Sequence, residues 1–177
     1  MKQIFLITGA TGSGKTSLIT NTLTEINKVG LKTTGIYSPA RFENRVKTGI
    51  FTVDLSTGEK ELLAIHQPGW DPKNPAREWK MDPEVLKWGD DVIRNSVPTT
   101  VLVIDELGYL EFEKKKGWTS AFTIISEGDY KIAIVVIRPG LLEQALIKFE
   151  NAEIITVEDP TQIKEHASFL VSQILAI

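Results

Sequence analysis

Cysteine is absent from this sequence of 177 residues, which excludes disulfide bonds, thiolate metal sites and cysteine nucleophiles. Histidine is scarce, and His66 and His166 are too few and too isolated to indicate a zinc site. No apolar run is long enough to cross a bilayer, and the short run after Lys2 lacks the pattern of a cleaved targeting segment. We therefore expect a soluble, cytoplasmic protein with no membrane partner.

A strong excess of one charge is also absent. Lys and Arg number 20, Asp and Glu number 23, and the formal net charge is −3. Proteins that bind DNA or RNA usually present a basic surface to the phosphates, so this balance counts against a nucleic-acid partner. The apolar content of 42% suits one compact α/β domain over residues 1–177. No feature of the sequence identifies a protein partner.

Short apolar runs alternate with segments of helical periodicity, which is typical of βαβ units and a mostly parallel sheet. Helices are predicted after Gly14, from Asp82 to near Pro98 and from Asp159 to the end, the last two starting with Asp-Pro pairs that favour a first turn. An antiparallel hairpin is predicted from residues 50–55 and 61–65. The other predicted strands cover residues 4–8, 32–37, 101–104, 132–137 and 154–157.

The segment 66–80 has three prolines, two tryptophans and no periodicity, so we expect a long irregular excursion there. Such loops often carry function, and this one is a candidate for binding a substrate. Tryptophan side chains can stack on a nucleobase, but in irregular regions they more often pack beneath a loop. We expect packing for at least three of the four tryptophans, which are Trp70, Trp79, Trp88 and Trp118.

A glycine-rich segment directly follows the first predicted strand and opens the first predicted helix. It matches the pattern G-x-x-x-x-G-K-[ST], in which glycines let successive backbone N–H groups point at phosphate oxygens. The N-terminus of the following helix adds a favourable dipole. We therefore predict a phosphate-binding loop for a nucleoside triphosphate, built by Gly9, Ala10, Thr11, Gly12, Ser13, Gly14, Lys15, Thr16 and Ser17.

Two side chains of this loop have separate expected roles. Lys15 supplies positive charge to the β- and γ-phosphates. Thr16 is expected to place its hydroxyl on Mg²⁺, which keeps most of its waters and needs only one or two protein oxygens. Mg²⁺ is therefore the predicted cofactor.

Acidic residues follow the predicted strand 101–104. A buried parallel strand delivers the residues after it to the carboxyl edge of the sheet, where Asp105 would hold the metal directly or through water. Glu106 would orient or deprotonate the water that attacks the γ-phosphate. For Glu111 we expect a surface salt bridge.

Three stretches resemble a P-loop nucleoside-triphosphatase family whose members include the thermophile and the human cancer-related nucleoside-triphosphatases. They are the loop 9–16, the segment Asp105-Glu106-Leu107-Gly108-Tyr109-Leu110-Glu111, which is similar to D-E-[IL]-G-x-[ML]-E, and residues 37–55. In the last stretch Lys47 and Ile50 stand where the family has an Arg and a Phe.

The resemblance implies a P-loop NTPase fold, with a mostly parallel sheet flanked by helices and an inserted antiparallel hairpin. It also implies slow, Mg²⁺-dependent hydrolysis of several nucleoside triphosphates, ATP and GTP among them. The family's biological role is poorly defined, so the resemblance names no pathway.

Phosphoryl transfer needs positive charge beyond Lys15 and the metal, and an arginine commonly supplies it. Arg138 follows the strand 132–137 and should emerge at the same sheet edge as Asp105, which makes it the first candidate. The alternative for Arg138 is a surface position. Arg41, Arg45 and Lys47 are the second choice, as a mobile cover over the phosphates, although a solvated loop is the simpler interpretation.

Three functions remain open from the residues alone. The leading one is hydrolysis of nucleoside triphosphates with broad base tolerance. The second is a kinase for a nucleotide or other small molecule, against which no Arg-rich lid segment is found. The third is a nucleotide-dependent binding module, and the lack of an [NT]-K-x-D motif counts against a conventional GTPase switch.

Overall fold

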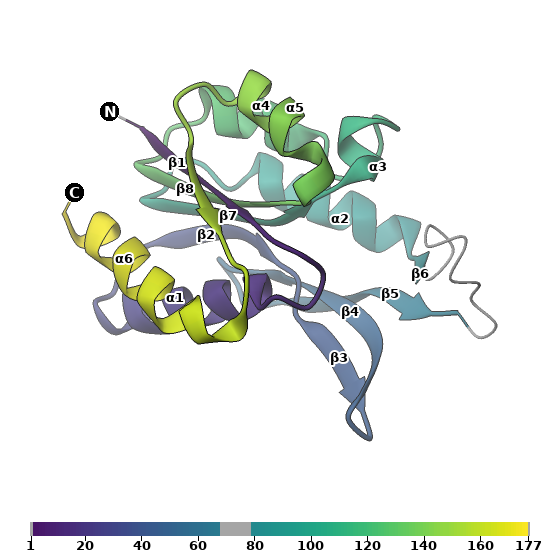
Figure 1. Cartoon of the computed structure of the whole chain (residues 1–177). Helices are drawn as coiled ribbons and strands as arrows, with labels where there is room; N and C mark the ends of the chain where they lie inside the picture. Colours follow the sequence, from purple (N-terminus) through teal and green to yellow (C-terminus); the bar gives the residue numbers. More distant parts are fainter. Residues whose placement is uncertain (1, 68–78, 177) are drawn as a thin grey trace.

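The computed structural model describes residues 2–67 and 79–176. Its centre is a nine-stranded sheet in the order β6-β5-β4-β2-β7-β8-β1-β9, with β3 paired to β4 (Figure 1). The strands are β1 Gln3–Thr8, β2 Thr33–Tyr37, β3 Ala40–Glu43, β4 Val46–Asp54, β5 Lys60–His66, β6 Trp79–Met81, β7 Val101–Leu107, β8 Ile132–Ile137 and β9 Glu153–Thr156.

The five strands β2, β7, β8, β1 and β9 run parallel, as the alternating sequence pattern predicts. Strands β7 and β8 are the most deeply buried, because helices cover both faces of the sheet and nearly every side chain of these strands is apolar. Alternate residues supply two separate cores: Val103 faces one layer, and Ile104 faces the other. The parallel part of the sheet is therefore a rigid platform.

In the part of the chain that the structure describes, helices cover both faces of this platform (Figure 1). Helices α1 and α6 pack together on one face, and α2, α4 and α5 pack on the other with the short α3. The helices are α1 Lys15–Lys28, α2 Pro83–Arg94, α3 Tyr109–Phe112, α4 Ser120–Glu127, α5 Leu142–Lys148 and α6 Ile163–Leu175. None of the described helices is long and apolar enough to cross a membrane.

Helix α2 begins as its sequence predicts. The Asp82 carboxylate accepts hydrogen bonds from the backbone N–H groups of Glu84 and Val85, at 2.9 and 3.3 Å. Helix α6 begins at Ile163 after a single 3₁₀ turn that follows Asp159. Three short helices, α3, α4 and α5, were absent from the sequence prediction, because segments of four to eight residues give too little periodicity to recognise.

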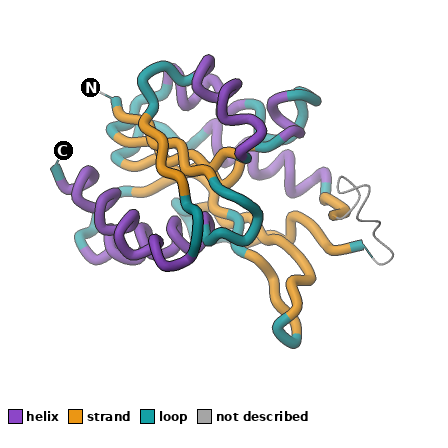
Figure 2. The backbone as a smooth tube through the Cα atoms, viewed as in Figure 1, coloured by secondary structure: helices purple, strands orange, loops and turns teal. Residues whose placement is uncertain are grey.

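The antiparallel part of the sheet is larger than predicted. The hairpin of β4 and β5 is confirmed, but β3 adds a second hairpin through a turn at Asn44 and Arg45, whose φ angles are 48° and 65° (Figure 2). The expectation of a loop is therefore wrong for Arg41 and Lys47, which lie in β3 and β4. Arg45 does lie in the turn between these strands, and Arg45 and Lys47 are exposed to solvent as expected.

The predicted irregular segment 66–80 lies mostly outside the described residues, and Trp70 lies there too. Its two ends are regular: His66 closes β5 and pairs with Trp79, which opens β6. The antiparallel strands therefore extend to both edges of that segment.

Candidate active site

The glycine-rich loop lies between β1 and α1, at the carboxyl edge of the parallel strands. Gly9, Gly12 and Gly14 have φ angles of 150°, 82° and 106°, a region that residues with side chains rarely adopt. A Cβ added to Gly9 would lie 2.3 Å from the carbonyl oxygen of Val157, and one on Gly14 would lie 2.6 Å from Ile163 Cδ1. The packing of the chain around β9 and α6 therefore fixes the loop's curl, and the glycines make that curl possible.

Lys15 folds back over this loop. Its Nζ donates hydrogen bonds to the carbonyl oxygens of Gly9 and Ala10, both at 2.8 Å. Burial lowers the pKa of Lys15, the charges of Glu106 and Asp105 oppose that fall, and the charge of Arg138 adds to it. The ammonium thus lies within electrostatic range of Asp105, Glu106 and Arg138.

Asp105 comes from the end of β7 and is 3% exposed. Its carboxylate accepts a hydrogen bond from the backbone N–H of Ser38 at 3.3 Å, and the Ser38 hydroxyl donates to the Asp105 carbonyl oxygen. Burial, followed by the charge of Glu106, raises the pKa of Asp105 to about 7, while Ser38, the Thr16 side chain and Lys15 act against the rise. A buried carboxylate beside a hydroxyl is a suitable set of oxygen donors for a divalent cation.

Sequence reasoning missed Ser38. It follows β2 at the same sheet edge as Asp105, and β2 pairs with β7, so its position in the chain was the available signal.

Glu106 and Arg138 form an ion pair across the ends of β7 and β8. Arg138 Nε donates to Glu106 Oε1 at 2.6 Å, and the two side chains are 53% and 28% exposed, with Arg138 the more exposed. The structure therefore places Arg138 at the edge where its position after β8 predicts it, and not on a remote surface. Both side chains have the partial exposure that contact with a bound ligand requires.

The prediction of a surface salt bridge for Glu111 is wrong. Glu111 is 4% exposed and its carboxylate accepts hydrogen bonds from two backbone N–H groups, those of Gly108 at 2.9 Å and Trp118 at 3.1 Å. A signal was present in the sequence, because a glutamate three residues after a helix-capping position typically folds back onto that cap.

Of the three candidate cations Arg41, Arg45 and Lys47, only Lys47 affects the pKa of Lys15, which its positive charge lowers. Lys47 Nζ lies 4.9 Å from the centre of the Trp79 ring, a cation–π contact. Arg41 instead pairs with Glu43 on its own strand. The hairpin therefore brings one of its three candidate cations into electrostatic range of Lys15 in the glycine-rich loop.

Packing is the role of the three tryptophans that the structure describes. Trp118 is buried in the core beneath α2 and α4, and Trp79 and Trp88 pack against the same core. The expectation of packing for at least three tryptophans is confirmed.

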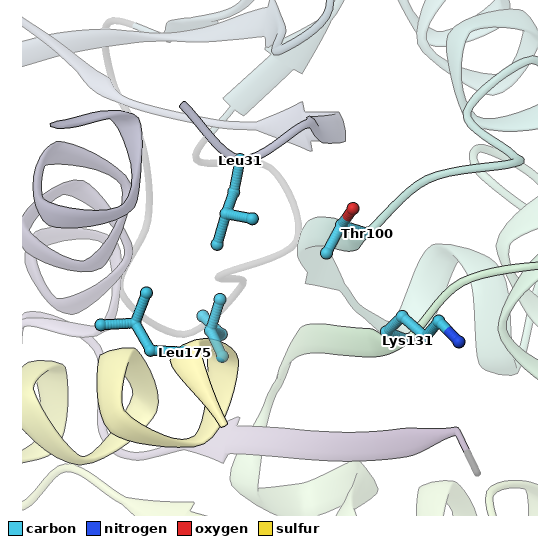
Figure 3. Close-up of a pocket in the computed structure, with 5 residues that line it drawn as sticks. Leu31, Thr100, Lys131 and Leu175 are labelled. Atoms are coloured by element: carbon cyan, nitrogen blue, oxygen red, sulfur yellow. The ribbon is translucent and has the colours of Figure 1, made fainter. Parts of the chain in front are cut away.

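A pocket of about 290 Å³ lies at the opposite edge of the sheet (Figure 3). Leu31, Thr100 and Lys131 each precede one of the parallel strands, and the end of α6 supplies the remaining lining. This pocket is therefore separated from the glycine-rich loop by the length of the strands.

The chain is similar in sequence to known proteins. The sequence model of a family described as NTPase matches residues 4–165. Two curated relatives are both named nucleoside-triphosphatase THEP1: that of Caldivirga maquilingensis is 28% identical over 113 residues, and that of Korarchaeum cryptofilum is 28% identical over 118 residues. The matches cover 64% and 60% of this chain, but only 63% and 55% of the relatives' own lengths.

Two solved structures have the same fold. A human cancer-related nucleoside triphosphatase superposes with a TM-score of 0.71 and 20% identity, covering 98% of this chain and 97% of the other. THEP1 from Aquifex aeolicus gives a TM-score of 0.72 at 17% identity, with 97% and 99% coverage.

Proposed function

The chain belongs to the NTPase family, and from that membership we propose that it hydrolyses nucleoside 5'-triphosphates to the diphosphate and phosphate, in a Mg²⁺-dependent reaction with broad base tolerance. The curated relatives carry the name nucleoside-triphosphatase, which supports the reaction class. ATP and GTP are both among the proposed substrates, and the cytoplasm is the proposed location.

One observation carries the proposal: Glu106 pairs with Arg138 at the sheet edge that holds the glycine-rich loop, and both charges lie within electrostatic range of the Lys15 ammonium group. Lys15 comes from α1, Glu106 from β7 and Arg138 from the segment after β8, and the charges of the last two both act on Lys15. A γ-phosphate needs cations around it and a base nearby, and these three groups supply both. Lys15 and Arg138 would neutralise the charge of the transferred group.

The residues present fit a divalent cation. The Asp105 carboxylate is buried and shares its surroundings with the Thr16 side chain, so two oxygen ligands for Mg²⁺ would come from the two motifs that the sequence indicates. When bound, Mg²⁺ would offset the negative charge of the β- and γ-phosphate oxygens. The tight curl of the loop also fits a bound phosphate. It depends on glycine at position 9, because a side chain there would clash with the Val157 carbonyl oxygen.

The protein's own groups would position the triphosphate and the attacking water, and would accept the proton of that water. The backbone N–H groups of residues 9–17 would bind the phosphates at the start of α1, where the helix dipole favours anions. Glu106 would use the oxygen that is not paired with Arg138 to orient a water and accept its proton. Arg138 holds Glu106 in place and presents its remaining N–H groups to the γ-phosphate.

Broad base tolerance follows from where the contacts lie. The charged and glycine-rich groups described above all address phosphates, and Trp79, Trp88 and Trp118 pack against the core. A kinase would need a binding place for an acceptor, and the segment that the sequence offers for it lies mostly outside the described residues. The matching family model and the names of the curated relatives support hydrolysis as the reaction, and the acceptor assay below tests the kinase alternative.

The test is a phosphate-release assay with ATP, GTP, CTP and UTP, each with Mg²⁺ and with a chelator, and with and without a panel of small hydroxyl and phosphate acceptors. We expect Mg²⁺-dependent release from all four, with kcat/KM values within about a thousandfold, or roughly 4 kcal/mol, of one another. A wider spread would mean a dedicated base pocket. Phosphate transfer to an acceptor in place of release would contradict the proposal.

A further inference from the structure

Glu111 is a buried carboxylate to which the proposed reaction assigns no role. Both of its oxygens are used: Oε2 accepts from the Gly108 N–H at 2.9 Å and Oε1 accepts from the Trp118 N–H at 3.1 Å. Burial raises the pKa of Glu111, and the two backbone N–H groups act against that rise. A buried charge is costly unless it is hydrogen-bonded, so the carboxylate depends on these two N–H groups and ties the backbone at Gly108 to the backbone at Trp118.

The backbone that Glu111 holds is the turn after β7, which lies close to the ion pair of Glu106 and Arg138. Leu107 pairs with Ile137, which places Gly108 next to Arg138. A Cβ added to Gly108 would lie 3.5 Å from Arg138 Nε, the atom that donates to Glu106. The turn therefore begins two residues after Glu106, at the end of β7, and lies against Arg138.

The Glu111 carboxylate is also closely packed on the side that faces Gly117. Gly117 has a φ of 71°, and a Cβ added there would lie 2.2 Å from Glu111 Oε1. The carboxylate thus lies directly against the backbone of Gly117, and any side chain at this position would displace it. The fold leaves room for this one placement of Glu111.

We propose that Glu111 is a positioning residue, which fixes the turn after β7 so that Glu106 and Arg138 keep their paired geometry beside the phosphate loop. The proposal rests on the hydrolytic function proposed above, and it gives Glu111 no contact with the nucleotide. A glutamine at this position keeps the shape but has a single accepting oxygen, so its NH₂ group would face one of the two N–H donors.

A matched control exists in the same core layer. Asp90 is also buried, at 7% exposed, and it accepts hydrogen bonds from the Ser120 backbone N–H at 2.9 Å and the Ser120 hydroxyl at 2.8 Å. It therefore holds the start of α4, two residues after Trp118, without contacting the turn after β7. Asp90 also pairs with Arg94 at 2.6 Å, so Asp90→Asn removes a buried carboxylate together with its own ion pair, but it leaves the pair of Glu106 and Arg138 alone.

The kinetic arm compares Glu111→Gln, Asp90→Asn and the wild type, each at a temperature well below its own unfolding midpoint. Glu111→Gln should lower kcat by about 10- to 100-fold, since small misplacements of reacting groups have effects of that size. Its affinity for the Mg²⁺-bound triphosphate should change by less than about threefold, because the loop 9–17 is untouched. Asp90→Asn should lose stability but keep kcat and KM.

A second readout needs no turnover, so it separates this proposal from the proposed function. In the wild type the Arg138 Nε–H should be protected from exchange with water by its bond to Glu106, and it can be followed as a side-chain NMR signal assigned with Arg138→Lys. Glu111→Gln should lose this protection although Arg138 and Glu106 are both still present. Asp90→Asn should retain it.

Glu111→Asp keeps the charge but is one methylene shorter, so it cannot reach both N–H groups, and it carries the test if Glu111→Gln fails to fold. Unchanged kcat and unchanged Arg138 protection in either folded variant would overturn the proposal. Loss of folding in both variants would overturn it too, because Glu111 would then serve the fold alone. A wild type that shows the protection but no hydrolysis would overturn the proposed function and leave the positioning role standing.

Discussion

Replacing Glu106 by Gln separates nucleotide binding from water activation. The change keeps the side-chain shape and removes one negative charge that lies 2.6 Å from Arg138 Nε. A glutamine can still accept from Arg138, but it cannot take a proton from water. We therefore expect affinity for the triphosphate to stay constant or rise, because the repulsion between a carboxylate and the γ-phosphate is gone.

The size of the effect on rate follows from the role assigned to the carboxylate. General-base catalysis contributes about 10²- to 10⁴-fold, so kcat should fall within that range. Stability should change little: the pair is partly exposed, and such pairs contribute about 0.2 to 1 kcal/mol. A fall in rate therefore cannot be ascribed to unfolding, which thermal melts of both proteins would verify.

The assay combines equilibrium binding of a Mg²⁺-bound triphosphate with single-turnover phosphate release. Asp91→Asn is the control, because Asp91 is an exposed carboxylate paired with Arg94 at 3.1 Å on α2, away from the phosphate loop. The expected outcome is a trapped triphosphate complex in Glu106→Gln and normal turnover in the control. Hydrolysis by Glu106→Gln at the wild-type rate would refute the assignment of water activation to this residue.

Three further substitutions, one of them with a control variant, test other features of the molecule. Arg138→Ala should lower kcat by about 10- to 10³-fold and should weaken triphosphate affinity much less. This loss of rate is smaller than that caused by removing an arginine finger from an assisted enzyme. A wild-type kcat in steady-state kinetics would return Arg138 to a structural role. Lys47→Ala should raise KM by about 3- to 10-fold because a cation near Lys15 is lost. Lys60→Ala, which removes a similar lysine–aromatic contact on β5, should leave KM unchanged, and equal effects of the two would dismiss a role for Lys47. Asp82→Ala should lower the free energy of unfolding by about 1 kcal/mol through loss of the α2 cap without changing kcat, and denaturation curves that superpose on the wild type would contradict this.

The features that sequence could predict are those with local physical causes. Residues 101–104 of β7 and the whole of β8 are continuous apolar runs, Asp82 precedes a proline at a helix start, and the glycine-rich loop has a fixed spacing. Because parallel strands bring their carboxyl ends to one edge of a sheet, the positions of Asp105 and Arg138 in the chain were enough to predict that both lie there.

The features that sequence missed depend on contacts between distant residues. Glu111 lies in the short helix α3, and although its spacing from Gly108 was a local signal, its burial also depends on the N–H group of Trp118, seven residues further on. The turn at Asn44 and Arg45 needs positive φ angles at both positions, and Arg45 gives no signal for that. Lys47 reaches the site only because β4 pairs within the large sheet.

The most direct test of the central claim is hydrolysis in ¹⁸O-enriched water, with the products separated and weighed by mass spectrometry. Attack of water on the γ-phosphorus breaks the bond from that phosphorus to the bridging oxygen, so the released phosphate should carry one ¹⁸O and the diphosphate none. Lys15→Ala should nearly abolish the labelled phosphate, because the phosphates lose their main charge partner at the loop. Label in the nucleoside diphosphate, or no labelled phosphate from the wild type with Mg²⁺, would contradict the proposed reaction.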